Sequence, residues 1–173
     1  GVQLDAAGAQ LKRLVEAWRV PFVASYKAKG VIAEDHPLCL GATGLSPVVD
    51  KIHMAHVREA DLILTIGFDP VELRADWMAP WDEKKATVNI DLVPNTHHVY
   101  RSSYEYAGSI VGCLHTLTQA APKRAPSRWL DADLDRYRRT IQHAIESNPV
   151  KGLGPYQAAV ALREVFPRDT IAS

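Results

Sequence analysis

One uninterrupted apolar run constrains the fold of this chain more than any other segment. The residues from Leu62 to Ile66 are apolar or β-branched without polar alternation, a helical pattern precedes them, and Gly67 with Pro70 ends the run. A continuous apolar run between such signals is typical of a parallel β-strand that is buried on both faces. The run therefore predicts an α/β domain with this strand at its centre.

The rest of the chain alternates between helical and strand patterns. We expect helices over residues 5–18, 48–58 and 129–145, and two more that begin near Ser109 and Pro155. We expect strands over residues 20–25, 62–66, 86–90 and 104–107. Strands that alternate with helices form parallel sheets through right-handed crossovers. The pattern therefore predicts an α/β fold with a doubly wound, mostly parallel sheet and helices on both faces, as in Rossmann-like domains.

Charge and cysteine content exclude several classes of protein. Twenty basic residues balance twenty acidic ones, so no net field favours nucleic acid or an anionic membrane. No apolar run reaches the roughly 20 residues of a membrane helix, and no signal peptide opens the chain. Cys39 and Cys113 lack metal-site or disulfide spacing and are interpreted as buried free thiols in a reducing cytoplasm. His53 and His56 have no third ligand nearby, so no metal site is predicted.

Composition divides the chain into three parts. Proline and lysine concentrate in residues 120–127, and residues 148–154 form a second linker. We expect a domain over residues 1–121, a linker with a helix over 122–153, and the start of a further domain over 154–173. The abrupt beginning, with a truncated first strand, and the unpaired strand expected at 170–172 indicate a piece excised from a longer protein.

Candidate binding residues follow the expected strands. Gly67, Phe68 and Asp69 follow the first run, and Asp91 ends the strand over 86–90. Ligands of open α/β sheets bind outside the carboxyl ends of the strands. The same residues also fit an ordinary strand end at which the side chains only pack and bind no ligand. Asp91 suits either a bond from a ribose hydroxyl or the cap of the following turn.

Two further loops offer anion-binding features. Lys27 and Lys29 follow the strand that ends at Ser25, where they either meet a phosphate or are solvated. Gly41 and Gly44 precede a helix that Ser46 and Pro47 can cap and begin. A helix N-terminus behind a glycine loop can bind an anion, although the spacing is neither G-x-G-x-x-G nor a P-loop. The segment 34–36, Glu-Asp-His, suits acid–base chemistry or, more simply, a structural turn.

Four segments together carry a resemblance to a known family. They are residues 20–32 with 34–38, the glycine loop 40–44, the central run 60–72, and Val-Asn-Ile-Asp at 88–91. With these segments the chain resembles the central domain of thiamine-diphosphate-dependent enzymes of the acetolactate synthase and pyruvate oxidase group. The resemblance covers residues 1–121, and residues from Gly154 onward resemble the entry to the family's diphosphate-binding domain.

The resemblance implies a function for a longer enzyme. Such an enzyme acts on a 2-oxo acid such as pyruvate, by carboligation or decarboxylation, and forms a homo-oligomer, a dimer or tetramer. Its thiamine diphosphate and Mg²⁺ bind outside this chain, so no catalytic residue is assigned here. In relatives that hold a flavin or adenine nucleotide in this domain, the matching loops bind it. That nominates Ser25, Lys27, Gly41, Gly44, Gly67, Phe68, Asp69 and Asp91 as cofactor-binding residues.

One departure from the family pattern argues against FAD. Flavin-binding members read Gly-Ala-Arg after the central strand, whereas this chain reads Gly67-Phe68-Asp69. That form resembles the flavin-independent acetolactate synthases. The alternative to an enzyme is a stand-alone nucleotide-binding or regulatory module of the same fold, since fold alone does not separate the two. We also expect self-association through exposed Trp129, Leu130, Leu134 and the last helix.

Overall fold

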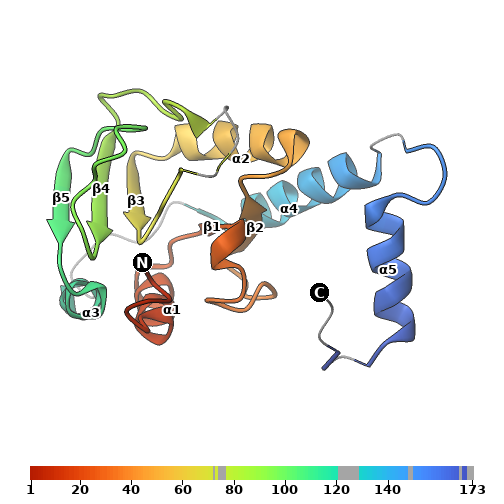
Figure 1. The fold of residues 1–173 in the computed structure, drawn as a ribbon, viewed down its shortest axis with the longest axis horizontal. Coiled ribbons are helices and arrows are strands. Elements are labelled where there is room, and N and C mark those ends of the chain that lie inside the picture. The colour runs from red at the N-terminus through yellow and green to blue at the C-terminus, as the bar shows by residue number, and fades with distance from the viewer. Residues whose placement is uncertain (72, 74–76, 121–128, 148–149, 168, 171–173) are drawn as a thin grey trace.

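The computed structural model contains five helices of more than one turn and five strands within the residues it describes (Figure 1), which are 1–71, 73, 77–120, 129–147, 150–167 and 169–170. In chain order the elements are α1 (Gly8–Trp18), β1 (Phe22–Ser25), the 3₁₀ turn η1 (Tyr26–Ala28), β2 (Cys39–Thr43), α2 (Pro47–Glu59), β3 (Leu62–Ile66), β4 (Ala86–Asp91), β5 (Tyr104–Ala107), α3 (Ile110–Ala120), α4 (Asp131–Glu146) and α5 (Pro155–Val165). The predicted α/β alternation is confirmed. The linker expected over 120–127 and the strand over 170–172 lie almost wholly outside the described residues.

All strand pairs in the described residues are parallel, as predicted, but they form two groups. β1 pairs with β2, while β3, β4 and β5 form a separate three-stranded sheet in that order. β3 is therefore an edge strand here, with a neighbour on one side only. The expectation that its run is buried on both faces is wrong, since Leu62 is 43% exposed while Ile63 and Thr65 are buried.

β2 is a strand where the sequence indicated a glycine loop. Cys39 lies opposite Phe22 and Thr43 opposite Ser25, with an irregularity in the register between them. Between the pairs Phe22–Cys39 and Ala24–Ala42, β2 has one more residue than β1, which is the pattern of a β-bulge. Gly41 lies in this interval with a φ of +107°. A glycine inside a strand often marks such a bulge, and it masked the strand signal in the sequence.

The main core lies between the three-stranded sheet and the pair of helices α1 and α3, which lie side by side in Figure 1. Its buried members are Val2, Ala7, Leu14, Ile90, Ile110 and Leu114. Trp18 of α1 adds a bond from its indole nitrogen to the Leu117 carbonyl oxygen at 3.0 Å. The helical periodicity that predicted α1 and α3 therefore reflects one shared buried face.

A second core confirms that the irregular segment after β3 is packed. Trp77, Trp81, Val99 and Tyr100 are buried together with Met54 of α2 and Ile63 of β3. The indole rings and the phenol ring of Tyr100 account for much of this cluster. The long connection from β3 to β4 therefore covers the sheet face on the side of α2.

α4 is docked on the domain instead of lying free as a linker. Leu134 is only 1% exposed and packs with Val15, Leu38 and Leu40. The expectation that Leu134 is an exposed contact residue is therefore wrong, because the face of α4 that carries it covers β2 and the end of α1. Trp129 is half-buried. Leu130 is 64% exposed, as expected.

α5 lies at the right of Figure 1, where its Tyr156 hydroxyl donates to Glu146 at the end of α4 at 3.0 Å. None of the residues of α5 is buried. Leu162 is 50% exposed and Val165 is 79% exposed, and Phe166, which follows the helix, is 49% exposed. A helix of 11 residues is marginal in water without a packed face. The helix therefore presents an apolar surface, as expected. No helix in the described part of the chain is long and apolar enough to cross a membrane.

Candidate functional site

Seven of the eight predicted binding residues lie at or just beyond the carboxyl ends of strands, whereas Gly41 lies within β2, and the structure brings the eight together in two groups. Ser25, Lys27, Gly41 and Gly44 belong to β1, β2 and the residues that follow them; Gly67, Phe68, Asp69 and Asp91 follow β3 or end β4. In the first group Gly44 lies against the Tyr26 ring, and in the second Gly1 lies against both Gly67 and Asp91. The two groups belong to two separate sheets, and the role of these residues in binding stays a prediction.

The absence of a side chain at Gly67 allows the backbone at the N-terminus of the chain to come close. It has a φ of +56°, and a Cβ there would lie 2.4 Å from the Val2 nitrogen. That is too close for any side chain without a shift of backbone. In this structure Gly67 therefore permits the close approach of the chain's own backbone.

Phe68, Asp69 and Asp91 are engaged in local contacts. The Phe68 ring lies 5.8 Å from the Trp77 ring and 5.9 Å from the Tyr100 ring. Asp69 Oδ1 accepts a bond from the Val71 nitrogen at 3.0 Å, and Asp91 Oδ1 accepts one from the Leu92 nitrogen at 2.7 Å. Both carboxylates thus cap the turns that follow them. For Asp91 the turn-cap interpretation is the one that this geometry supports.

The glycine segment of β2 is fixed by a carboxylate that the sequence reading missed. Asp50 of α2 is fully buried, and its Oδ1 accepts bonds from Thr43 Oγ1 at 2.7 Å and from the Gly44 nitrogen at 2.8 Å. The available signal was an acidic residue in the first turn of a predicted helix. The predicted cap of this helix is confirmed, with Ser46 Oγ accepting from the Val49 nitrogen at 3.4 Å and Pro47 at the first position.

The polar segment after β1 is held by internal pairs. Lys29 Nζ lies 2.9 Å from Glu34 Oε1, and Lys27 Nζ lies 6.0 Å from the centre of the Tyr26 ring. His36 Nδ1 accepts a bond from the Leu38 nitrogen at 3.2 Å, and its Nε2 faces Glu16. The turn over residues 34–36 is therefore structural in its contacts, which favours that interpretation over acid–base chemistry.

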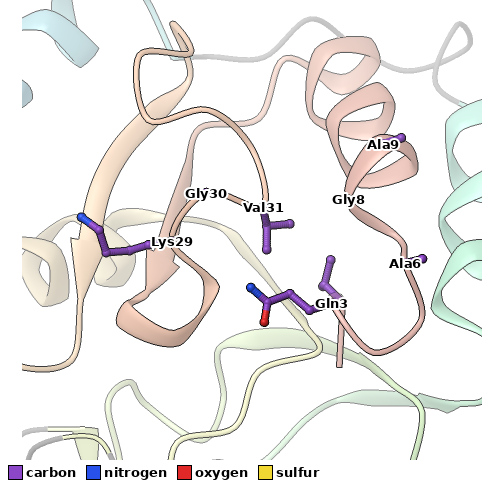
Figure 2. A pocket seen from close by; sticks show the side chains of 8 residues that line it. Gln3, Ala6, Gly8, Ala9, Lys29, Gly30 and Val31 are labelled. Atoms are coloured by element: carbon purple, nitrogen blue, oxygen red, sulfur yellow. The ribbon is translucent and has the colours of Figure 1, made fainter. Parts of the chain in front are cut away.

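A cavity of about 330 Å³ opens between the N-terminal segment and the loop after η1 (Figure 2). It is lined by Val2, Gln3, Ala6, Gly8, Ala9, Lys29, Gly30 and Val31. The side chains of Gln3 and Val31 point toward one another, whereas Lys29 extends away from them. None of the eight predicted binding residues is among the lining residues, although Lys29 of the loop after β1 is. Sequence reasoning missed the N-terminal segment as a cavity wall.

Metal-ligating groups are dispersed. Among the described residues no three His, Cys, Asp or Glu side chains gather into a cluster that could hold a metal ion. Both cysteines are free; Cys39 is buried as expected, whereas Cys113 is half-buried. Burial raises the pKa of both thiols, which keeps them protonated and unreactive near neutral pH.

Comparison with known proteins identifies the family. Residues 1–119 match the family described as thiamine pyrophosphate enzyme, central domain. The chain belongs to this family. The matched region contains every element from α1 to β5 and all but the last residue of α3. The sequence resemblance to the acetolactate synthase and pyruvate oxidase group is confirmed.

Three relatives show how far the similarity extends. Pyruvate oxidase of Lactiplantibacillus plantarum is 22% identical over 100% of this chain and 28% of its own length. Acetolactate synthase of Bacillus subtilis is 26% identical over 65% of this chain and 20% of its own. A probable acetolactate synthase large subunit of Methanocaldococcus jannaschii is 36% identical over 39% and 11%, respectively. The chain thus spans less than a third of the length of these relatives.

The family implies thiamine diphosphate with Mg²⁺, and the donor groups of the residues that the structure describes do not fit them. A diphosphate-bound Mg²⁺ is held by carboxylates and other oxygen ligands that converge. The described residues provide no such cluster. No step of thiamine chemistry is therefore assigned to residues of this central domain.

Proposed function

We propose that this central domain is part of a longer thiamine-diphosphate-dependent enzyme that acts on a 2-oxo acid such as pyruvate. The reaction is carboligation, as in an acetolactate synthase, or decarboxylation. The observation that supports this most is the family match over residues 1–119, together with similarity to relatives named for acetolactate and pyruvate chemistry. Thiamine diphosphate supplies the electron sink for such reactions, and the protein positions it.

The role of the central domain in this proposal is architectural. Its strand-end residues are engaged by the chain itself, as Gly67 is by Val2 and as Gly44 is by Asp50. Asp69 and Asp91 each cap a turn. Such contacts fix the shape of the carboxyl edge and leave the reacting groups to other domains. The eight nominated residues remain our proposal for any nucleotide that this edge accepts.

Activity of the complete protein tests the proposal. We expect the product of the whole reading frame to consume pyruvate only when thiamine diphosphate and Mg²⁺ are both present, with release of CO₂ and formation of acetolactate or an aldehyde. The 173-residue chain alone is expected to be inactive. A complete reading frame without flanking domains, or turnover that scales with the pure 173-residue chain, contradicts the proposal and favours the stand-alone module.

Flavin should not be required by the same protein. An arginine–phosphate bond contributes roughly 1.5–3 kcal/mol, and the exposed Asp69 carboxylate stands where flavin-binding relatives have the arginine. We expect weak FAD binding, measured as quenching of flavin fluorescence on titration. Asp69→Arg should strengthen it, while Asp61→Arg, another exposed aspartate before β3, should not. Stoichiometric binding to the unchanged protein at low micromolar concentration contradicts this part of the proposal.

The proposal includes assembly into a homo-oligomer, a dimer or tetramer. The exposed apolar side chains of α5 and of Leu130 support it, because contiguous apolar patches usually mark contact surfaces. For the 173-residue chain we expect a mass above that of a monomer in light scattering as concentration rises. Leu162→Lys with Val165→Lys should lower that mass. A strictly monomeric chain at high concentration speaks against α5 as a contact surface.

A further inference from the structure

Two histidines and one tyrosine meet where α4 docks on α2. His53 has no exposed surface, and its Nδ1 lies 2.8 Å from the Tyr137 hydroxyl oxygen. The His56 ring centre lies 4.3 Å from that of Tyr137 and 4.4 Å from that of Trp129. Both histidines belong to α2, whereas Tyr137 belongs to α4. The contact between these helices therefore passes through two imidazole rings.

Three further contacts hold α4, and one of them is a solvent-exposed ion pair between Arg19 and Asp131 at the start of the helix, which contributes little. Leu134 packs in the core, and Arg138 Nε donates to the Cys39 carbonyl oxygen at 3.1 Å. An arginine keeps its charge throughout the accessible pH range, and a leucine carries none. A change in pH from neutral to mildly acidic therefore acts on this interface mainly through His53 and His56.

We propose that α4 is a proton-sensitive clasp, held on α2 and β2 while His53 and His56 are neutral and released when they are protonated. Undocking removes Tyr137 from both rings and lets water reach them, although His53 keeps its contact with β2 beside Gly41. In the docked state the Tyr137 hydroxyl can turn to accept a bond from protonated His53 Nδ1. The cost of protonation therefore comes from burying the charge, more than from losing this bond.

Burial sets the direction of the pH effect. It lowers the pKa of His53 to about 4, against the opposing influence of the Ala42 carbonyl and the Asp50 carboxylate. Burial also lowers the pKa of His56, which Glu59 partly opposes. Tyr137 stays a neutral phenol, because burial raises its pKa.

The charged and titratable groups around the rings come from three elements. On α2 these are Asp50, whose Oδ1 already accepts two hydrogen bonds, and Glu59. On α4 they are Tyr137 and Arg138, and the Arg138 charge disfavours a second cation at this interface. On β2 the group is the Cys39 thiol, which burial keeps neutral. Two carboxylates thus attract a proton, and for His53 burial still outweighs them.

The sign of the effect follows from these pKa shifts. An undocked histidine titrates near its ordinary pKa of about 6.5, and docked His53 near 4. Above about pH 6.5 both states are neutral and docking is complete. As the pH falls from 6.5 toward 4, the undocked state gains a proton that the docked state lacks, so docking weakens by up to tenfold per unit. His53 then shifts the equilibrium toward release by at most about two orders of magnitude, because β2 still covers part of its ring after α4 leaves.

Hydrogen exchange measured segment by segment on the 173-residue chain tests the clasp. After correction for intrinsic exchange rates, we expect the protection factors of α4 amides to fall at least about tenfold, and at most about 100-fold, between pH 7 and pH 4.5. Amides of α3, which packs in the other core, should keep theirs. Loss of protection in α3 and α4 together shows global acid unfolding and overturns the proposal, as does retained protection of α4.

Matched variants separate the histidines from other acid effects. His53→Gln with His56→Gln, which cannot be protonated, should remove most of the pH dependence in α4. Tyr104→Phe, a change of an exposed tyrosine on β5, should leave the dependence unaltered. If the double variant does not fold, NMR titration of the unchanged protein decides. His53 titrating near pH 6.5 while α4 stays protected overturns the proposal, and release of α4 along with His53 titration supports it.

Discussion

Leu114→Ala should lower the free energy of unfolding by about 2–5 kcal/mol, the usual cost of truncating a fully buried leucine. Leu114 of α3 has no exposed surface and packs with Leu14 of α1 and Ile90 of β4. The truncation removes apolar contacts and leaves a cavity between three elements that cannot all move inward. Urea denaturation followed by circular dichroism measures the change.

Val111→Ala is the matched control for this prediction. Val111 lies on the same helix one turn before Leu114 but is 38% exposed. Its truncation removes little buried surface, and we expect a loss within about 0.5 kcal/mol. Equal losses at both positions would contradict a core between α1, α3 and the three-stranded sheet.

Asp50→Ala should lower the free energy of unfolding by about 2–4 kcal/mol. The carboxylate accepts bonds from the Thr43 hydroxyl and the Gly44 nitrogen inside the protein. Each buried donor left without a partner costs about 1–3 kcal/mol. Thermal and urea denaturation measure the loss, and amide exchange at Gly44 reports whether the end of β2 opens.

Asp50→Asn separates the acceptor from the carboxylate charge. The amide oxygen of asparagine can still accept both bonds, and its NH₂ group takes the place of Oδ2, which has no partner within the described residues. We expect a smaller loss than for alanine. Asp61→Ala, at an exposed position, should change stability by less than about 0.5 kcal/mol. An asparagine variant as unstable as the alanine one would contradict this account of Asp50.

The sequence by itself determined those helices and strands that have a clear local pattern of apolar residues. Helical spacing of Leu11, Leu14 and Val15 predicted α1, and the apolar run from Leu62 to Ile66 predicted β3. Ser46 and Pro47 predicted the start of α2. These signals are local, because side-chain periodicity and caps depend on a few neighbouring residues. The family followed from the same segments in combination.

Only the tertiary structure decided which of these elements pair or pack against one another. β2 was not predicted because Gly41 weakens the strand pattern of this segment. In the structure the segment still forms a strand, because it pairs with β1. Leu134 is buried because α4 docks on β2, and Asp50 acts as an acceptor because Gly44 lies beside it. The close approach of Val2 to Gly67 joins residues 65 positions apart. Apart from the bond between Asp50 and Gly44, which are only 6 positions apart, these contacts join segments distant in sequence, so no local pattern carries them.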